Sequence, residues 1–260
     1  MNQVSATRRW ETVFWPAVTA GVILVFWAAS IRLMHATIFP SPLAVATGAG
    51  QLVQGGLYFK YIADSLRRVT SGYLIAVGLG IPFGLVLGWY PIAGQIVNPT
   101  IQILRPISPI AWIPIAILLF GVGDMASIYL VFIASFFPIV VSTMNGVRNV
   151  PQMYRRAGRN FGLSPGNLLR QVVFPAALPQ MLVGLRIALG IAWLVVVAAE
   201  MIASDSGLGY LVIDARNSGK RYDLVVAAMI TIGVIGLMLD FLLRRLETLK
   251  TVRWGFRNAS

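Results

Sequence analysis

Six long apolar stretches constrain this chain more than any other feature. The hydrocarbon core of a bilayer is about 30 Å thick, and a helix needs about 20 apolar residues to cross it. A backbone in lipid must also satisfy its own hydrogen bonds, which a helix does within one segment. We therefore predict an all-α membrane protein with about six transmembrane helices. The stretches are residues 13–31, 69–89, 96–120, 126–144, 178–202 and 224–243.

The composition agrees with a membrane protein. Hydrophobic residues make up 57% of the chain and charged residues 12%, whereas about a quarter of the residues in a soluble domain are charged. This balance argues against a water-soluble enzyme. The sequence contains no cysteine, which excludes disulfides, thiolate catalysis and cysteine metal sites.

The basic residues predict the orientation of the chain. Lys and Arg number 21 against 9 acidic residues, and basic loops are retained on the cytoplasmic side. If both termini lie in the cytoplasm, the outer loops hold only four basic residues well clear of the span ends: Lys60, Arg216, Lys220 and Arg221. Arg67 and Arg68, at the outer entry to the second span, are exceptions to the rule. The cytoplasmic basic residues are then Arg8, Arg9, Arg148, Arg155, Arg156, Arg159, Arg170, Arg244, Arg245, Lys250, Arg253 and Arg257.

This map divides the chain into three parts. Residues 1–12 form a cytoplasmic N-terminus, residues 13–246 a transmembrane domain, and residues 247–260 a basic cytoplasmic tail.

Small residues in the second stretch lie four positions apart. Such spacing gives a helix one smooth face on which another backbone can pack closely. The residues are Gly72, Ala76, Gly80, Gly84 and Gly88. We expect this face to be a helix-packing surface.

Prolines interrupt several of the stretches, most of all the third, with Pro106, Pro109 and Pro114. A proline in lipid frees a carbonyl that another group must satisfy, so broken helices tend to line protein or a water-filled path. The prolines therefore favour a transport pathway, and a kink that serves only packing is the alternative.

The loop at residues 148–176 has the pattern of two short helices joined by a turn. Pro151 suits the first turn of one helix, and Gly162 suits its left-handed end. Ser164 and Pro165 suit the cap and first position of the next helix. An amphipathic loop that rests on lipid headgroups is the alternative.

The spacing in this loop resembles the EAA loop of ABC importer permeases. Arg156, Ala157 and Gly158 occupy the EAA positions, Gly162 is the glycine, and residues 172–175 complete the pattern. Arg replaces the family's Glu and Gly its last Ala. The resemblance implies a coupling helix that docks on a cytoplasmic ATPase. The coupling residues it implies are Tyr154, Arg155, Arg156, Ala157, Gly158, Arg159, Gly162, Leu163, Ser164 and Pro165.

The resemblance extends from about residue 39 to residue 246, and it is to the nitrate, sulfonate, taurine and bicarbonate branch of these permeases. Four segments carry it: FPSP at 39–42, SLRRVTSGY at 65–73, ILRPISPIAWIPIAILLFGVGD at 103–124, and GLRIALGIAWLVVVAAEMIASDSGLGYL at 184–211.

The resemblance implies a bacterial inner-membrane subunit that imports a small anion by alternating access. Its partners would be a second permease copy, two ATPase subunits and an external solute-binding protein, with membrane lipid around it and no nucleic acid. The chain has no GxxxxGK[ST] phosphate loop, so ATP and Mg would be bound by the ATPase, and this chain would hold no cofactor or metal.

Four residues within the spans are candidates for the pathway: Trp112, Arg186, Trp193 and Glu200. Ionisable groups in a membrane are costly and indicate function by default. For Arg186 the alternatives are snorkelling to the cytoplasmic headgroups or a bond to a neighbouring helix. For Glu200 they are a structural bond to a neighbouring helix or loop, gating, or contact with the docking protein, and for the tryptophans core packing. We expect Asp240 to pair with a basic residue such as Arg244, one helical turn on.

Other functions remain open at this point. An ion-coupled secondary transporter would favour inverted repeats, and no internal self-similarity is evident. A membrane-embedded enzyme needs convergent catalytic groups, whereas this chain has one histidine, His35, and scattered carboxylates. An ABC exporter subunit is the third alternative.

Overall fold

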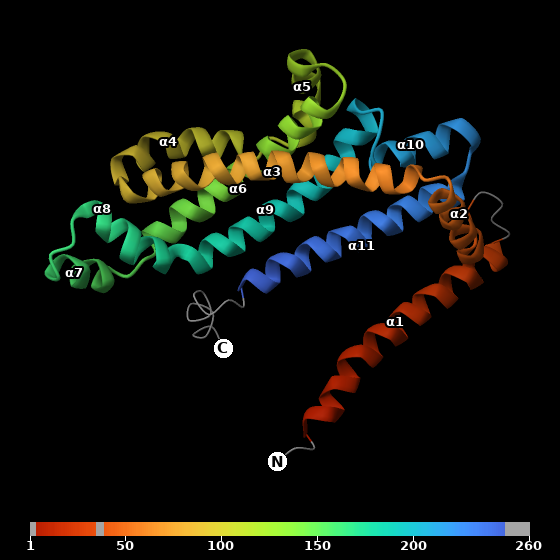
Figure 1. Ribbon diagram of the computed structural model, residues 1–260, viewed down its shortest axis with the longest axis horizontal. Coiled ribbons are helices and arrows are strands. Elements are labelled where there is room, and N and C mark those ends of the chain that lie inside the picture. Colours follow the sequence, from red (N-terminus) through yellow and green to blue (C-terminus); the bar gives the residue numbers. More distant parts are fainter. Residues whose placement is uncertain (1–3, 35–38, 248–260) are drawn as a thin grey trace. The chain divides into compact units, whose positions relative to one another are not determined.

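The computed structural model describes residues 4–34 and 39–247, and this part of the chain is almost entirely helical (Figure 1). Most of the basic tail at residues 247–260, and His35, lie outside the described residues. The helices are α1 (Val4–Met34), α2 (Pro42–Gln54), α3 (Leu57–Trp89), α4 (Pro91–Leu104), η1 (Pro109–Trp112), α5 (Ile113–Phe120), α6 (Asp124–Arg148), α7 (Gln152–Asn160), α8 (Pro165–Leu168), the π-turn η2 (Leu169–Val173), α9 (Phe174–Ala203), α10 (Leu208–Gly219) and α11 (Tyr222–Glu247).

Four segments of the described chain are long and apolar enough to cross a membrane. They are Leu57–Trp89, Asp124–Arg148, Pro165–Ala203 and Tyr222–Arg245. Each contains one of the expected stretches, which confirms the second, fourth, fifth and sixth spans.

The third expected span needs correction. It is not one helix, because α4 and the pair η1 and α5 meet at a bend of 86°. Pro106 and Pro109 explain the break, since proline lacks the N–H that a continuing helix requires. The first expected span, residues 13–31, lies within the single helix α1, where the described residues Val18–Leu33 form an apolar stretch, and its crossing of the membrane stays a prediction.

The chain forms two compact units. The first comprises Met1–Phe59 and Leu211–Ile230. Within it, the Ser41 hydroxyl caps α2 by accepting from the Ala44 amide at 3.2 Å. Arg221 donates to Gln51 of α2 and to Asp223 of α11, each at 2.7 Å. These bonds hold α2 against the start of α11.

The second unit comprises Lys60–Tyr210 and Thr231–Ser260, and its described part packs around α6 and α9. The small residues of α3 lie against α6, as predicted. A Cβ at Gly72 would lie 2.6 Å from the Ile128 carbonyl oxygen, and one at Gly88 would lie 2.6 Å from Val147. The glycines thus allow α3 and α6 to pack closely. Buried Val131, Trp193 and Val196 belong to the core that this packing encloses.

Candidate functional site

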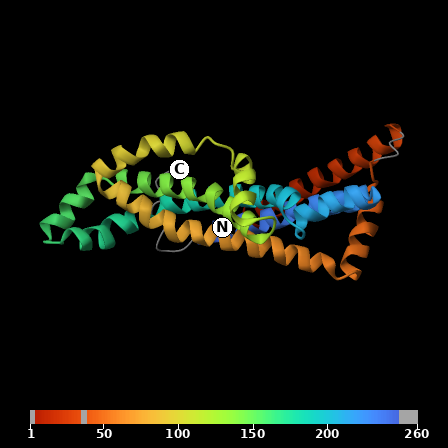
Figure 2. The same ribbon diagram turned by 90° about the horizontal axis from the view of Figure 1, so that it is seen from above.

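The loop between α6 and α9 forms a projecting element. In Figures 1 and 2, α7 and α8 extend past the adjoining ends of α6 and α9. We call residues 148–176 the coupling element, after the role that the sequence predicts for them. Its first helix, α7, is preceded by Pro151, which takes the cap position rather than the expected first turn.

The turn after α7 has the geometry predicted for Gly162. Its φ is +77°, in the left-handed region. The Gly162 amide donates to the Arg159 carbonyl at 2.9 Å and the Leu163 amide to the Gly158 carbonyl at 3.1 Å. These paired bonds form a Schellman motif, which satisfies the last carbonyls of a helix. The backbone here is therefore fixed by its own bonds, and a side chain at Gly162 would strain it.

The second helix begins as predicted but does not end as predicted. Ser164 is the cap of α8 and Pro165 is its first residue. The helix then passes through the π-turn η2 into α9, so Pro165–Ala203 is one span of 39 residues. Pro175 offers a reason, because it cannot donate in the helical ladder and a π-turn absorbs such an interruption. The coupling element is thus joined to a transmembrane helix without a flexible link.

Gly158, which stands where the EAA pattern has its last Ala, is buried. A Cβ added there would collide with the terminal methyl of Leu168 in α8, and Leu163 and Val172 would each lie 3.4 Å away. Leu168 itself is 2% exposed. The departure from the pattern therefore has a packing reason: Leu168 fills the space that an alanine would need.

Apolar side chains at the tip of the coupling element face outward. Phe161 is 86% exposed, Met153 67% and Tyr154 41%. Arg156 and Arg159 are exposed beside them. Such a patch at the end of a projecting element is typical of a surface that binds another protein.

Arg155 points the other way and holds α7 to the rest of the unit. One of its guanidinium nitrogens donates to the Val147 carbonyl of α6 at 2.5 Å. The guanidinium carbon lies 5.9 Å from the centroid of the Trp89 ring of α3. Burial, and then the nearby charge of Arg159, lower the pKa of Arg155. Arg155 is thus an anchor, whereas its exposed neighbours are free to contact a partner.

Glu200 lies at the centre of a buried polar cluster. Its carboxylate accepts hydrogen bonds from Arg68 at 2.9 Å, from the Ser65 hydroxyl at 2.8 Å and from the Gly209 amide at 3.0 Å. A Cβ at Gly207, whose φ is +105°, would collide with the same carboxylate. The alternative interpretation of Glu200, a structural bond to a neighbouring helix or loop, describes this arrangement, because its partners lie on α3 and α10.

Arg68 explains the exception in the charge map. It is 1% exposed, and besides Glu200 it pairs with Asp124 at 2.6 Å and donates to the Ser206 hydroxyl at 2.6 Å. Arg67 also pairs with Asp124. The two arginines therefore carry compensated charge. One indication of the pairing of Arg68 with Glu200 was present in the sequence: each is an ionisable residue in a largely apolar helix, and the two have opposite charge.

Arg186 and Trp193 line the same cavity, between α9 and α11. The cavity is about 360 Å³ and Asp240 also lines it. Arg186 Nε lies 3.7 Å from Asp240, and Arg244 pairs with Asp240 at 2.8 Å, which confirms the predicted pairing of Asp240 with Arg244. The Trp193 indole donates to the Ile232 carbonyl at 3.0 Å.

Trp112 and Glu200 lie elsewhere. Trp112 is the last residue of η1, just before α5, and packs with the cluster around Ile113 and Ala116. The four candidate pathway residues therefore do not converge on one place, and their role in a pathway stays a prediction.

Comparison with known proteins identifies the family. Residues 80–251 match the family described as "binding-protein-dependent transport system inner membrane component". A protein of Methanocaldococcus jannaschii named as an ABC transporter permease is 39% identical over 242 residues, which are 91% of this chain and 90% of the relative. The taurine transport system permease protein of Escherichia coli is 36% identical, over 88% of this chain and 86% of the relative. A nitrate import permease protein of Synechocystis is 35% identical, over 90% of this chain and 88% of the relative.

Solved structures share the fold. A chain of the MetNI methionine ABC transporter in an inward-facing conformation matches with a TM-score of 0.66 at 19% identity, over 77% of this chain and 97% of that one. A chain of an amino acid ABC transporter matches with a TM-score of 0.64 at 17% identity, over 76% and 96%. This chain belongs to the binding-protein-dependent transport system inner membrane component family and is a multi-pass ABC importer permease subunit, not an ion-coupled transporter, an exporter subunit or an enzyme.

Proposed function

We propose that this chain forms half of the translocation pathway for a small anionic solute of the nitrate, sulfonate, taurine or bicarbonate class. Two relatives of nearly full coverage are named for the import of nitrate and of taurine. A binding protein outside the membrane would deliver the solute, and an ATPase inside would supply the energy.

The observation that carries the mechanism is the construction of the coupling element. Exposed Phe161, Met153 and Tyr154 would dock on the ATPase, with Arg156, Ala157 and Arg159 beside them. The Schellman turn at Gly162 fixes the docked surface to α8, and α8 continues through η2 into α9. A displacement of the tip would therefore move a transmembrane helix.

The proposed cycle is alternating access. ATP and Mg, bound by the partner subunits, would close the two ATPases and bring two coupling elements together, and the spans would turn from inward-facing to outward-facing. Nucleotide and solute can drive such a cycle only because they bind the two states with different affinity.

The proposed assembly contains two copies of this chain, two ATPase subunits and one external binding protein, in the inner membrane of a bacterium. Residues 1–12, the coupling element and residues 247–260 would be cytoplasmic around a transmembrane domain at 13–246. The supporting observation is the number of basic residues in those segments, which the positive-inside rule places in the cytoplasm.

Gly162→Val tests the coupling role. A β-branched residue at a φ of +77° strains the turn, so we expect at least a tenfold loss of solute uptake in cells while the chain still inserts. Gly56→Val is the matched control. Gly56 has a φ of +73° and nothing within 4 Å of an added Cβ, but lies between α2 and α3. Normal uptake by the Gly162 variant would contradict the proposal.

A further inference from the structure

A polar groove runs between α4 and α6 in the second unit. Asn98, Gln102 and Arg105 recur at helical spacing along α4 to its end, and Asn145 and Arg148 line the opposite wall on α6. The cavity is about 330 Å³. We call these five side chains the polar groove.

The groove carries positive charge with no acidic residue in its lining. The Arg148 guanidinium donates to the Leu87 carbonyl at 3.3 Å. The Arg105 side chain has no hydrogen bond or ion pair within the part of the chain that the structure describes, and it is exposed. A charge at membrane depth is costly unless it faces water, protein or a ligand, so this wall of the unit is unsuited to lipid.

The backbone beside Arg105 points to the same conclusion. Residues 105–108 are not helical, and they join α4 to η1 at the bend of 86°. Irregular backbone at this depth is tolerated where it is buried in protein or lines a water-filled cavity, and interrupted helices mark the solute sites of many transporters.

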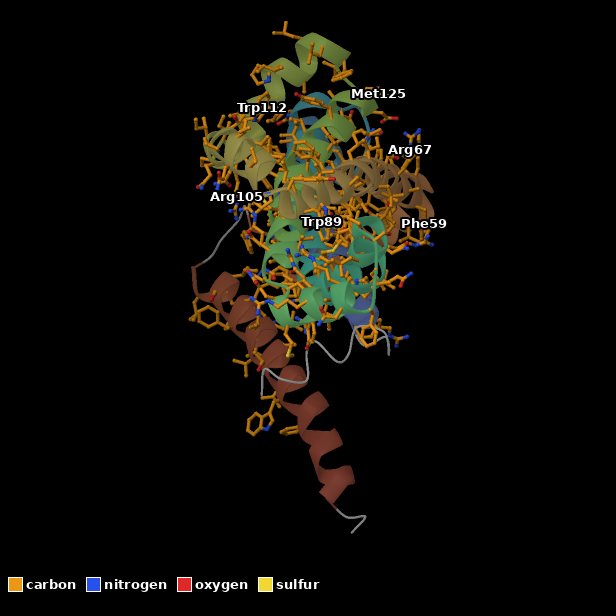
Figure 3. The ribbon with its side chains drawn as sticks, turned by 90° about the vertical axis from the view of Figure 1, so that its left-hand side faces the viewer. Phe59, Arg67, Trp89, Arg105, Trp112 and Met125 are labelled. Atoms are coloured by element: carbon orange, nitrogen blue, oxygen red, sulfur yellow. The ribbon has the colours of Figure 1, made fainter. Side chains whose placement is uncertain are left out.

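A second cavity adjoins the groove at Arg105. It is about 200 Å³, and the rest of its lining is apolar, including Ile107, Phe137, Ile187 and Ile191. Figure 3 shows Arg105 at one side of the unit, on the opposite side of the view from Arg67. Arg105 is therefore the residue that the polar and apolar cavities share.

We propose that the polar groove binds the anionic group of the solute at Arg105, and that the adjoining apolar cavity takes up its organic substituent. The ligand class is a small oxyanion with a short apolar tail, such as an alkanesulfonate, and a bare oxyanion such as nitrate fills the groove alone. The guanidinium fork matches two oxygens of such a group, and the amides of Asn98, Gln102 and Asn145 supply further donors. This inference rests on the proposed function, because it places the groove on the pathway.

Saturation-transfer NMR on the full chain in lipid nanodiscs tests the site directly. The probe is sodium 1-butanesulfonate at constant ionic strength, with empty nanodiscs as the blank. We expect saturation of the butyl protons and its loss when nitrate is added. Arg105→Gln should weaken binding about tenfold or more, because it removes a charge-assisted hydrogen bond, and Arg148→Gln should weaken it less.

Two further variants separate binding from general effects of charge. Arg105→Lys keeps the charge and should retain part of the binding. Arg32→Gln removes an exposed arginine of α1 and should leave binding unchanged. Equal signals from the wild type and Arg105→Gln, or a signal that nitrate does not displace, would overturn the proposal.

Different results would contradict the proposed site and the proposed function. Arg105-dependent binding by a chain that associates with no ATPase would contradict the proposed function and support the site. Normal ATPase association and uptake without Arg105-dependent binding would contradict the site alone.

Discussion

Arg68 of α3 and Glu200 of α9 form an ion pair that solvent does not reach. Nη1 of Arg68 lies 2.9 Å from Oε1 of Glu200, and the two side chains are 1% and 0% exposed. Asp124 at the start of α6 and the Gly209 amide of α10 complete the cluster. The pair therefore ties four helices together at one end of the second unit.

Breaking this pair from one side should destabilise the protein strongly. Glu200→Ala leaves the buried charge of Arg68 without its partner on α9, and such a loss costs about 3–5 kcal/mol. We expect a clear fall in the thermal unfolding temperature in detergent. The double variant Arg68→Met with Glu200→Leu removes both charges and should recover part of the loss, because the Ser65 hydroxyl and the Gly209 amide still lose their acceptor. A Glu200→Ala protein as stable as the wild type would show that the pair contributes nothing.

Glycines on the two faces of α3 should respond differently to the same change. Gly72→Ala places a Cβ 2.6 Å from the Ile128 carbonyl oxygen, and overpacking of this kind costs about 1–3 kcal/mol. Gly78→Ala meets nothing within 4 Å and should be neutral or slightly stabilising, because Ala favours a helix. Thermal unfolding of both variants checks this, and equal stability would contradict the packing of α3 on α6.

Local signals in the sequence predicted much of the fold. Apolar length identified four spans, spacing identified the packing face of α3, and Gly162 marked the end of α7. The bend in the third span was not predicted, because prolines show that a helix is interrupted but not how far its two halves turn. The continuity of α8 with α9 was missed for a similar reason: the π-turn has no sequence signature of its own.

The charged residues were harder to place from the sequence. The pairing of Asp240 with Arg244 is local and was predicted. Arg68 and Glu200 are 132 residues apart, and only the packing of α3 on α9 brings them together. Nothing in the sequence distinguishes Arg105 from a boundary arginine, because its significance comes from the cavities on its two sides.

Substitutions at Gly158 and Leu168 should not have additive effects on uptake. Gly158→Ala restores the residue of the EAA pattern but collides with the Leu168 methyl, so it should reduce the stability of the coupling element. Gly158→Ala with Leu168→Ala opens the space and should be better tolerated than the sum of the single changes. A double-mutant cycle on uptake measures this coupling. Strict additivity would show that the two side chains do not share the space.

Arg155 should govern how firmly α7 is held. Arg155→Gln loses the bond to Val147 and the contact with Trp89, so the amides of α7 should exchange hydrogen faster. Hydrogen exchange followed by mass spectrometry resolves this segment. Arg156→Gln is the matched comparison, because Arg156 is exposed and its loss should leave exchange unchanged. Equal exchange in the two variants would contradict the anchoring role.

The most direct test of the account is mild purification of the tagged chain from its native membrane, with mass spectrometry of the proteins that accompany it. We predict an ATPase subunit at about one copy per permease, present with the wild type and lost with Phe161→Asp, which places a charge on the exposed tip of the coupling element. Val122→Asp changes an exposed valine of the link between α5 and α6, 67% exposed, and should retain the ATPase. An ATPase that remains bound to the Phe161 variant, or no ATPase with the wild type, would contradict the central claim.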